Sequence, residues 1–150
     1  MELFRISVKE HSRKLTASGS SNRWNKRGEY VLYTGEARSL STLELVVHRN
    51  AVKPEVGYEL MVISIPDDDK YLKTIRTTDL PVDWRNLSAY TVLQEIGSQW
   101  YSRKESLVLK VPSAVIPQES NYIINTRHEA FENEVKLVRN EPYFWDDRLL

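Results

Sequence analysis

Short apolar segments separated by turn-forming residues constrain the fold of this 150-residue chain more than any other feature. Most of them are bounded by Gly, Pro, Asp or Asn, a pattern typical of β-strands. Only residues 39–50 and 90–101 show the three- and four-residue apolar spacing of amphipathic helices. Because strands and helices do not alternate regularly, the sequence predicts an α+β fold rather than repeated βαβ units.

Alternation of apolar and polar residues predicts a first strand over Leu3–Val8, with Phe4, Ile6 and Val8 facing the core. The polar stretch 11–27 reads as a long loop, a kind of segment that is often functional. Further strands are expected at 30–34, 58–65, 71–75, 106–111, 122–125, 134–138 and 143–145, and a helical turn at 128–131.

Two helices are expected. In the first, over 39–50, Leu40, Leu43 and Val47 share one face, and Asn50 with Pro54 favours an end there. The second covers 90–101.

Composition limits the classes of protein that fit. Hydrophobic residues make up 41% and charged residues 28%, which predicts one soluble globular domain over 1–150. Lys+Arg and Asp+Glu number 21 each, and this balance argues against direct nucleic-acid binding. The absence of cysteine excludes disulfides and thiolate metal sites and favours a reducing, cytoplasmic setting. With no signal-peptide pattern, no run of about 18 apolar residues and no close histidine spacing, we expect no membrane span and no metal.

Two residues near the long loop are candidates for ligand binding. Arg23, at the end of that loop, can place two donors on a phosphate or carboxylate, or it can lie on the surface against Trp24. Tyr33 shares a side of its strand with Val31 and offers a flat ring and a hydroxyl, although the residue alone favours a tyrosine in the core.

Glu44 is the most informative single position. It falls at the edge of the predicted apolar face of helix 39–50, where a carboxylate has little water and is suited to chemistry. Ser41-Thr42-Leu43-Glu44 also fits a capping box, in which Glu44 would bond to the backbone of Ser41. The local sequence leaves both interpretations open.

Other polar groups are weaker candidates. Ser113 follows a strand without the glycines or histidine spacing of a serine hydrolase, so it is best regarded as a hydrogen-bonding group. Asn121 and Asn125 bracket a short strand. The run Asp67–Asp69 reads as a solvated turn, with a carboxylate metal site as the alternative. The five glycines form no phosphate-binding loop of the dinucleotide-fold or P-loop kind.

Taken in order, several stretches of the chain resemble the RES-domain family, the toxins of RES–Xre toxin–antitoxin pairs. The matching stretches are Leu3-Phe4-Arg5-Ile6, Arg23-Trp24-Asn25 with Gly28, Val31-Leu32-Tyr33-Thr34, Leu43-Glu44, Leu80-Pro81 with Trp84, Ile96-Gly97 with Trp100, Leu109 to Ala114, Asn121 to Asn125 with His128, and Asp147-Arg148-Leu149. The chain departs from the family pattern at Asn22, where many members carry glycine, and at Thr126, where proline is usual.

The resemblance implies a fold like that of ADP-ribosyltransferases, with two small twisted, mainly antiparallel sheets and a few helices. It also implies an enzyme that destroys cellular NAD, with NAD as substrate rather than cofactor. The implied catalytic residues are Glu44, Arg23 and Ser113, and the implied NAD-binding residues are Tyr33, Arg5, Asn121 and Trp24.

In the implied reaction, Glu44 stabilises the positive charge that develops as the nicotinamide–ribose bond breaks, and water or inorganic phosphate attacks the ribose. ADP-ribosyl transfer to a protein and a catalytically silent binding module are the alternatives. The resemblance also implies an Xre-type antitoxin as partner, in a complex that can be of higher order.

Overall fold

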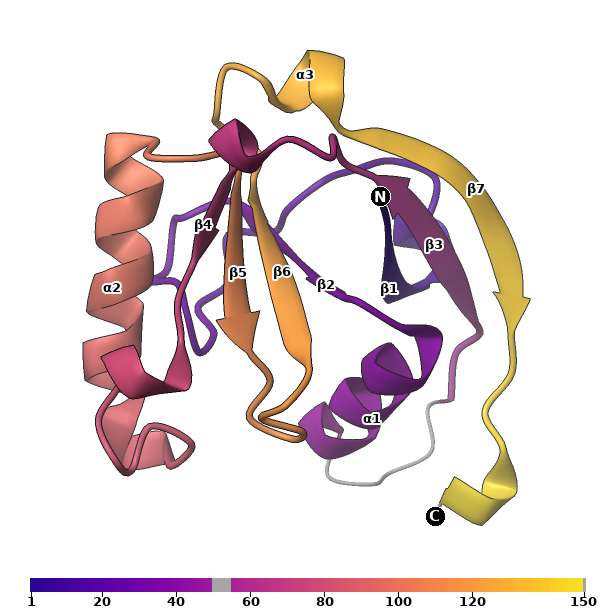
Figure 1. Ribbon diagram of the computed structural model, residues 1–150. Helices are drawn as coiled ribbons and strands as arrows, with labels where there is room; N and C mark the ends of the chain where they lie inside the picture. Colours follow the sequence, from indigo (N-terminus) through magenta and orange to yellow (C-terminus); the bar gives the residue numbers. More distant parts are fainter. Residues whose placement is uncertain (50–54, 150) are drawn as a thin grey trace.

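The computed structural model describes residues 1–49 and 55–149 (Figure 1). Within these residues the chain forms seven strands and three α-helices. Their bounds are β1 Glu2–Val8, β2 Val31–Gly35, α1 Arg38–His48, β3 Tyr58–Ser64, β4 Leu72–Thr74, α2 Tyr90–Arg103, β5 Val108–Pro112, β6 Ser120–Asn125, α3 Phe131–Glu134 and β7 Lys136–Tyr143. The predicted α+β class is confirmed.

The strands form one sheet in the order β4-β5-β6-β2-β1-β3-β7. All neighbours are antiparallel except β4 and β5. The expected division into two sheets is present in a modified form, because the halves β4-β5-β6-β2 and β1-β3-β7 are joined by the single registered pair Phe4↔Gly35. By contrast, β1 pairs with β3 along its whole length, from Glu2↔Ser64 to Val8↔Tyr58.

The core lies on both sides of this sheet. On one side Leu3, Leu32 and Ile124 pack with Ile63 and Leu107. On the other side α2, which lies beside β4 and β5 in Figure 1, places Leu93 and Trp100 against strand residues of β5 and β6. Because Leu3 and Phe4 are both buried, β1 has two packed faces near its start rather than the single core face predicted for Phe4, Ile6 and Val8.

Helix α1 packs on β1 and β2 beneath the point where the two halves of the sheet meet (Figure 1). The predicted helix is confirmed, but its apolar face is not: Leu40 is buried, whereas Leu43 and Val47 are 38% and 56% exposed. The proposed end signals, Asn50 and Pro54, lie outside the described residues.

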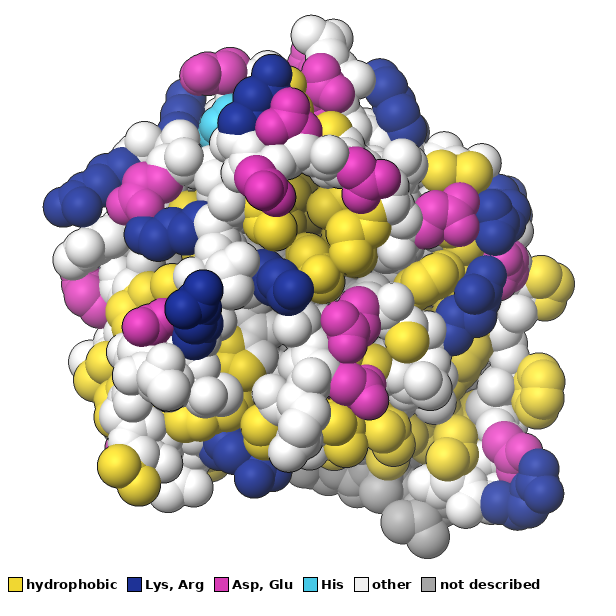
Figure 2. All heavy atoms as spheres, in the orientation of Figure 1, with side chains coloured by type: hydrophobic (Ala, Val, Ile, Leu, Met, Phe, Trp, Pro, Cys, Tyr) yellow, Lys and Arg dark blue, Asp and Glu magenta, His cyan; other side chains and the backbone are white. Residues whose placement is uncertain are grey.

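The C-terminal elements differ from the predicted ones in extent. The expected strands at 134–138 and 143–145 are one longer strand, β7, that ends at Tyr143, and the turn expected at 128–131 is α3 at Phe131–Glu134. On the face shown in Figure 2, lysine and arginine side chains are interspersed with acidic ones. None of the described helices is both long and apolar enough to cross a membrane.

Candidate functional site

A cleft of about 970 Å³ collects most of the residues proposed from the sequence. Its walls are β1, the turn at 18–24, β2, α1, the segment 82–90 and the residues that follow β5. Arg5, Arg23, Tyr33, Glu44 and Asn121 all line it. The volume is at the upper end of the range found for small-molecule sites, and it is large enough for an extended ligand.

The side chain of Glu44 is held from two strands. Its Oε1 accepts a hydrogen bond from Ser113 Oγ at 2.7 Å and another from Asn121 Nδ2 at 2.8 Å. Ser113 itself is fully buried just after β5, and Asn121 lies in β6. Of the residues at 1–49 and 55–149, none donates a hydrogen bond to Glu44 Oε2, so this oxygen is available to a ligand in the cleft.

The direction of the Ser113 hydrogen bond follows from its neighbours. Ser113 Oγ accepts the backbone N–H groups of Val115 and Ile116, each at 3.1 Å. Its only proton is therefore left for the carboxylate of Glu44. The loop after β5 thus presents the hydroxyl as a donor, which orients the carboxylate of Glu44.

The capping-box interpretation of Glu44 is wrong. Helix α1 begins at Arg38, which lies three residues before Ser41. The N-cap residue is Ala37, and it makes no side-chain hydrogen bond to the helix. Ser41 lies inside the helix, and its hydroxyl donates to the carbonyl oxygen of Phe4 at 3.0 Å. Glu44 is therefore free of the helix start and turned towards the cleft.

Arg23 stands at the tip of a tight turn. The backbone groups of Asn22 and Asn25 bond to each other across it, and Asn22 Oδ1 also accepts the N–H of Arg23. The Arg23 side chain reaches the segment after β4, where Nη1 donates to the carbonyl oxygens of Trp84 and Arg85, each at 3.2 Å. No described acid pairs with Arg23, and its Nε and Nη2 atoms have no hydrogen bond to a described residue.

Tyr33 and Trp24 both line the cleft. Tyr33 is half-buried and lines the cleft, and burial raises the pKa of its hydroxyl well above the usual range. The side chain of Trp24 is only 3% exposed and packs with Trp84, Leu93 and Trp100. Trp24 thus joins the core to the wall of the cleft, and its contact with NAD stays a prediction.

Arg5 is a half-buried cation beside the junction of the two sheet halves. Its Nη1 donates to the carbonyl oxygen of Tyr33 at 3.0 Å, and among the described residues it has no acidic partner. Burial lowers the pKa of its guanidinium group, although arginine still carries its charge at neutral pH. A desolvated cation that lines a cleft attracts an anion, because charge–charge attraction strengthens as water is excluded.

Two cleft residues, Tyr90 and Arg85, and one residue behind the cleft, Asn25, were not proposed from the sequence. The ring of Tyr90, the first residue of α2, lies 4.8 Å from the guanidinium carbon of Arg23. Arg85 Nε donates to the carbonyl oxygen of Ala114 at 2.8 Å. Asn25 joins the Arg23 turn to Tyr33. All three act through contacts between distant segments, and only Asn25, within the Arg-Trp-Asn stretch, could have been singled out from the sequence.

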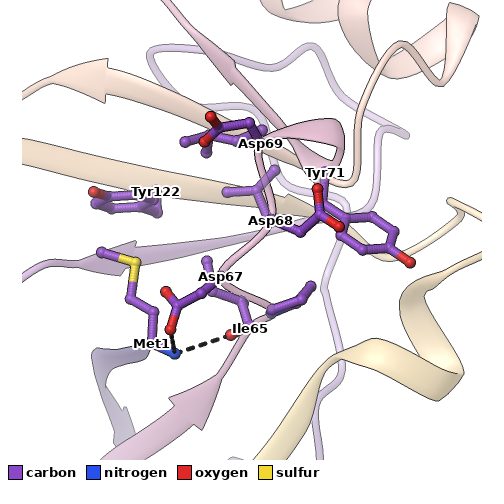
Figure 3. Close-up of a pocket in the computed structure, with 10 residues that line it drawn as sticks. Met1, Ile65, Asp67, Asp68, Asp69, Tyr71 and Tyr122 are labelled. Carbon is purple, nitrogen blue, oxygen red and sulfur yellow. Dashed lines mark hydrogen bonds and ion pairs between the residues drawn. The ribbon is translucent and has the colours of Figure 1, made fainter.

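The acidic run Asp67–Asp69 lies at a different, smaller hollow of about 160 Å³, shown in Figure 3. Asp67 pairs with the amino group of Met1 at 3.2 Å, and Asp68 accepts the N–H of Lys70. No group of three potential metal ligands occurs in the parts of the chain that the structure describes. This hollow is too small for a dinucleotide.

Comparisons with known proteins identify a family and several relatives. The RES domain profile matches residues 2–146. The chain is 31% identical to "Toxin Res" of Yersinia enterocolitica over 99% of both chains. It is 30% identical to "Toxin Res" of Pseudomonas putida over 99% of both chains. It is 31% identical to "Prs ADP-ribosylating toxin" of a Sphingobium species, over 87% of this chain and 81% of the relative.

Proposed function

This chain belongs to the RES-domain family, whose curated relatives named above are toxins, and on that premise we propose that it degrades NAD by cleaving the nicotinamide–ribose bond. The observation that carries the proposal is the hydrogen bonding of Glu44. Two donors hold Oε1, and Oε2 is left for a ligand in the cleft. A carboxylate fixed in this way can stabilise positive charge without having to reorganise.

The charge that needs stabilising develops on the nicotinamide ribose. As the bond from the anomeric carbon to the pyridinium nitrogen breaks, its electron pair leaves with nicotinamide, which departs as a neutral molecule. The ribose becomes oxocarbenium-like, and the negative charge of Glu44 lowers the energy of that state. Because the leaving group needs no proton, the cleft does not have to supply a general acid.

The two guanidinium groups in the cleft suit the pyrophosphate of NAD. Arg23 retains Nε and Nη2 for a ligand, and Arg5 is a half-buried cation without an acidic partner among the described residues. Arginine binds phosphate oxygens through paired N–H donors. The half-buried ring of Tyr33 offers a surface on which nicotinamide can stack.

Water or inorganic phosphate completes the reaction by attacking the anomeric carbon. Water yields ADP-ribose and releases one proton, whereas phosphate yields ADP-ribose 1″-phosphate. Phosphate is then a co-substrate, and the chain needs no cofactor. Product masses measured with and without phosphate in the buffer distinguish the two reactions.

The printed name of the Sphingobium relative favours a second candidate, ADP-ribosyl transfer to a protein. This reaction uses the same NAD site and replaces water or phosphate with a protein side chain. Incubation with labelled NAD and cell lysate separates the candidates, because transfer leaves label on protein whereas degradation leaves it on small molecules.

The toxin names of the relatives also support an antitoxin partner, for which we propose an Xre-type protein that covers the cleft. The toxin–antitoxin complex can then be of higher order. Addition of such a protein should stop NAD consumption. Unchanged consumption in the presence of a stoichiometric complex would contradict a blocking role.

Glu44→Gln tests the proposed reaction because it preserves shape and removes charge. We expect NAD consumption to fall by about 100-fold or more, measured as nicotinamide released per folded protein. Glu59→Gln is the matched control: Glu59 also accepts a serine hydroxyl, from Ser12 at 2.6 Å, and its side chain is 14% exposed, but it does not line the cleft. Near-parental turnover by folded Glu44→Gln protein would refute the proposed role of Glu44.

A further inference from the structure

Asn25 is only 1% exposed, and both polar atoms of its side chain are hydrogen-bonded. Nδ2 donates to the carbonyl oxygens of Ser20, Lys26 and Glu29, at 2.9, 3.1 and 3.3 Å. Oδ1 accepts the hydroxyl proton of Tyr33 at 2.6 Å. One side chain therefore ties both arms of the loop before β2 to a residue of β2 itself.

The hydrogen-bonded chain continues to Arg23. The Tyr33 hydroxyl, which donates to Asn25, accepts the backbone N–H of Trp24 at 3.0 Å. Trp24 follows Arg23 in the turn closed by Asn22 and Asn25. Burial raises the pKa of the Tyr33 hydroxyl, so its proton stays on the bond to Asn25 throughout the neutral range. The position of the Arg23 turn relative to the Tyr33 ring is thus set by two hydrogen bonds that share one hydroxyl.

Helix α2 supports the same turn from behind. Gln94 Nε2 donates to the carbonyl oxygen of Asn22 at 2.8 Å, and Ser98 Oγ donates to Glu29 Oε2 at 2.5 Å. Lys26 and Glu95 form an ion pair at 2.6 Å. These contacts hold the outside of the loop, whereas Asn25 holds its interior against β2.

We propose that Asn25 is a positioning residue that sets the distance between the Arg23 guanidinium group and the Tyr33 ring, and thereby the affinity of the cleft for its substrate. This inference rests on the proposed function for its substrate, NAD. Asn25 itself does not line the cleft, so it acts only through Arg23, Trp24 and Tyr33.

A second buried asparagine provides a matched control. Asn125 is 0% exposed, its Nδ2 donates to the carbonyl oxygen of Tyr101 at 3.2 Å, and its Oδ1 accepts the N–H of Arg127 at 2.9 Å. It ends β6 and does not line the cleft. Both asparagines are thus buried and hydrogen-bonded through both polar atoms of the side chain. Asn25 bonds to the loop before β2 and to Tyr33, whereas Asn125 bonds to residues outside the cleft.

The test compares Asn25→Asp with Asn125→Asp. The first change replaces the Nδ2 donor with an oxygen that faces three carbonyl oxygens, so the loop has to move. Because Ser113 and Asn121 hold Glu44 independently, we expect the KM for NAD to rise about 10- to 100-fold with little change in kcat. Partial unfolding lowers the concentration of active protein and hence the apparent kcat, but it leaves KM unchanged. We expect that second pattern for Asn125→Asp.

Tyr33→Phe keeps the inference testable if Asn25→Asp does not fold. It retains the aromatic ring and removes only the hydroxyl shared by Asn25 and Trp24, so KM should again rise. Where both single variants fold, we also measure KM for the double variant. Its rise in KM, expressed as free energy, should be smaller than the sum of the two single rises, because both changes break the same series of hydrogen bonds from Asn25 to Trp24. Unchanged KM in Tyr33→Phe and in any folded Asn25→Asp would overturn the positioning role.

Binding of inorganic pyrophosphate, measured by calorimetry, separates this inference from the proposed function. If the parent binds pyrophosphate but consumes no NAD, and Asn25→Asp weakens that binding, the proposed function falls and the positioning role stands. If the parent consumes NAD and Asn25→Asp does so with the parental KM, the positioning role alone falls. A parent that neither consumes NAD nor binds pyrophosphate overturns both.

Discussion

Ser113 Oγ lies 2.7 Å from Glu44 Oε1, although one residue follows β5 and the other lies in α1. Because two backbone N–H groups occupy the acceptor positions of the hydroxyl, Ser113 serves Glu44 as a donor only. We therefore propose that Ser113 orients the carboxylate of Glu44.

Ser113→Ala should lower kcat for NAD about tenfold, because the lost bond is one to a charged group and Asn121 alone then orients Glu44. Steady-state release of nicotinamide measures the effect. Ser106→Ala is the control: Ser106 is also buried, bonds Trp100 and Val108, and does not line the cleft. A loss of kcat that is equal in the two variants would point to instability rather than orientation.

Gly97→Ala should displace the Arg23 turn. A Cβ atom at position 97 would lie 1.7 Å from the carbonyl oxygen of Trp24, so helix and turn must move apart. We expect a loss of about 1–3 kcal/mol in the free energy of unfolding, measured in urea, and a raised KM for NAD. Gly57→Ala meets only the flexible side chain of Lys9 and should change stability by about 0.5 kcal/mol or less. Parental stability in Gly97→Ala would show that the close approach is not maintained in solution.

Tyr90→Leu should weaken NAD binding without affecting Glu44. The ring of Tyr90 lies against Arg23, and a cation–π contact of this kind contributes about 0.5–1 kcal/mol at an accessible site. KM should therefore rise about two- to fivefold, with kcat unchanged. Tyr90→Phe retains the ring and should behave as the parent. If Phe and Leu have equal effects, the hydroxyl rather than the ring is the important group.

The pH dependence of stability should reveal the ion pair between Arg38 of α1 and Glu141 of β7. Hydrogen bonds from Arg38, and secondarily from Arg139, lower the pKa of Glu141 from 4.5 to about 2. A lowered carboxyl pKa stabilises the fold above the unfolded pKa, and this stabilisation is lost as pH falls towards 2. Glu141→Gln should therefore be less stable than the parent at pH 6, and the difference should shrink between about pH 4.5 and 2. Melting temperatures over this range measure it, and a difference that is constant with pH would contradict the assignment.

Local sequence patterns were sufficient for the main elements. Alternation located β1, and three- and four-residue spacing located α1 and α2, because these patterns follow directly from strand and helix geometry. The same reasoning misplaced the buried face of α1. Leu43 and Val47 fit the helical period, but Glu44 and Ser41 on the same helix face the sheet and the cleft.

The site residues divide in a similar way. Residue type and family pattern were enough to propose Glu44, Arg23 and Tyr33, all of which line the cleft. Partners were harder to predict, because a bond such as that from Asn121 to Glu44 depends on how β6 lies relative to α1. For the same reason the packing of the Trp24 indole against Trp84 and Trp100 was not predicted.

The single pair Phe4↔Gly35 is the narrowest joint of the sheet, and the cleft lies across it. Arg5 comes from one half of the sheet, whereas Tyr33 and Asn121 come from the other. A dinucleotide bound to both halves would act as a non-covalent cross-link at the place where backbone hydrogen bonds are fewest. A ligand in the cleft would therefore raise the free energy of unfolding of the whole sheet, because a ligand that binds only the folded state stabilises that state.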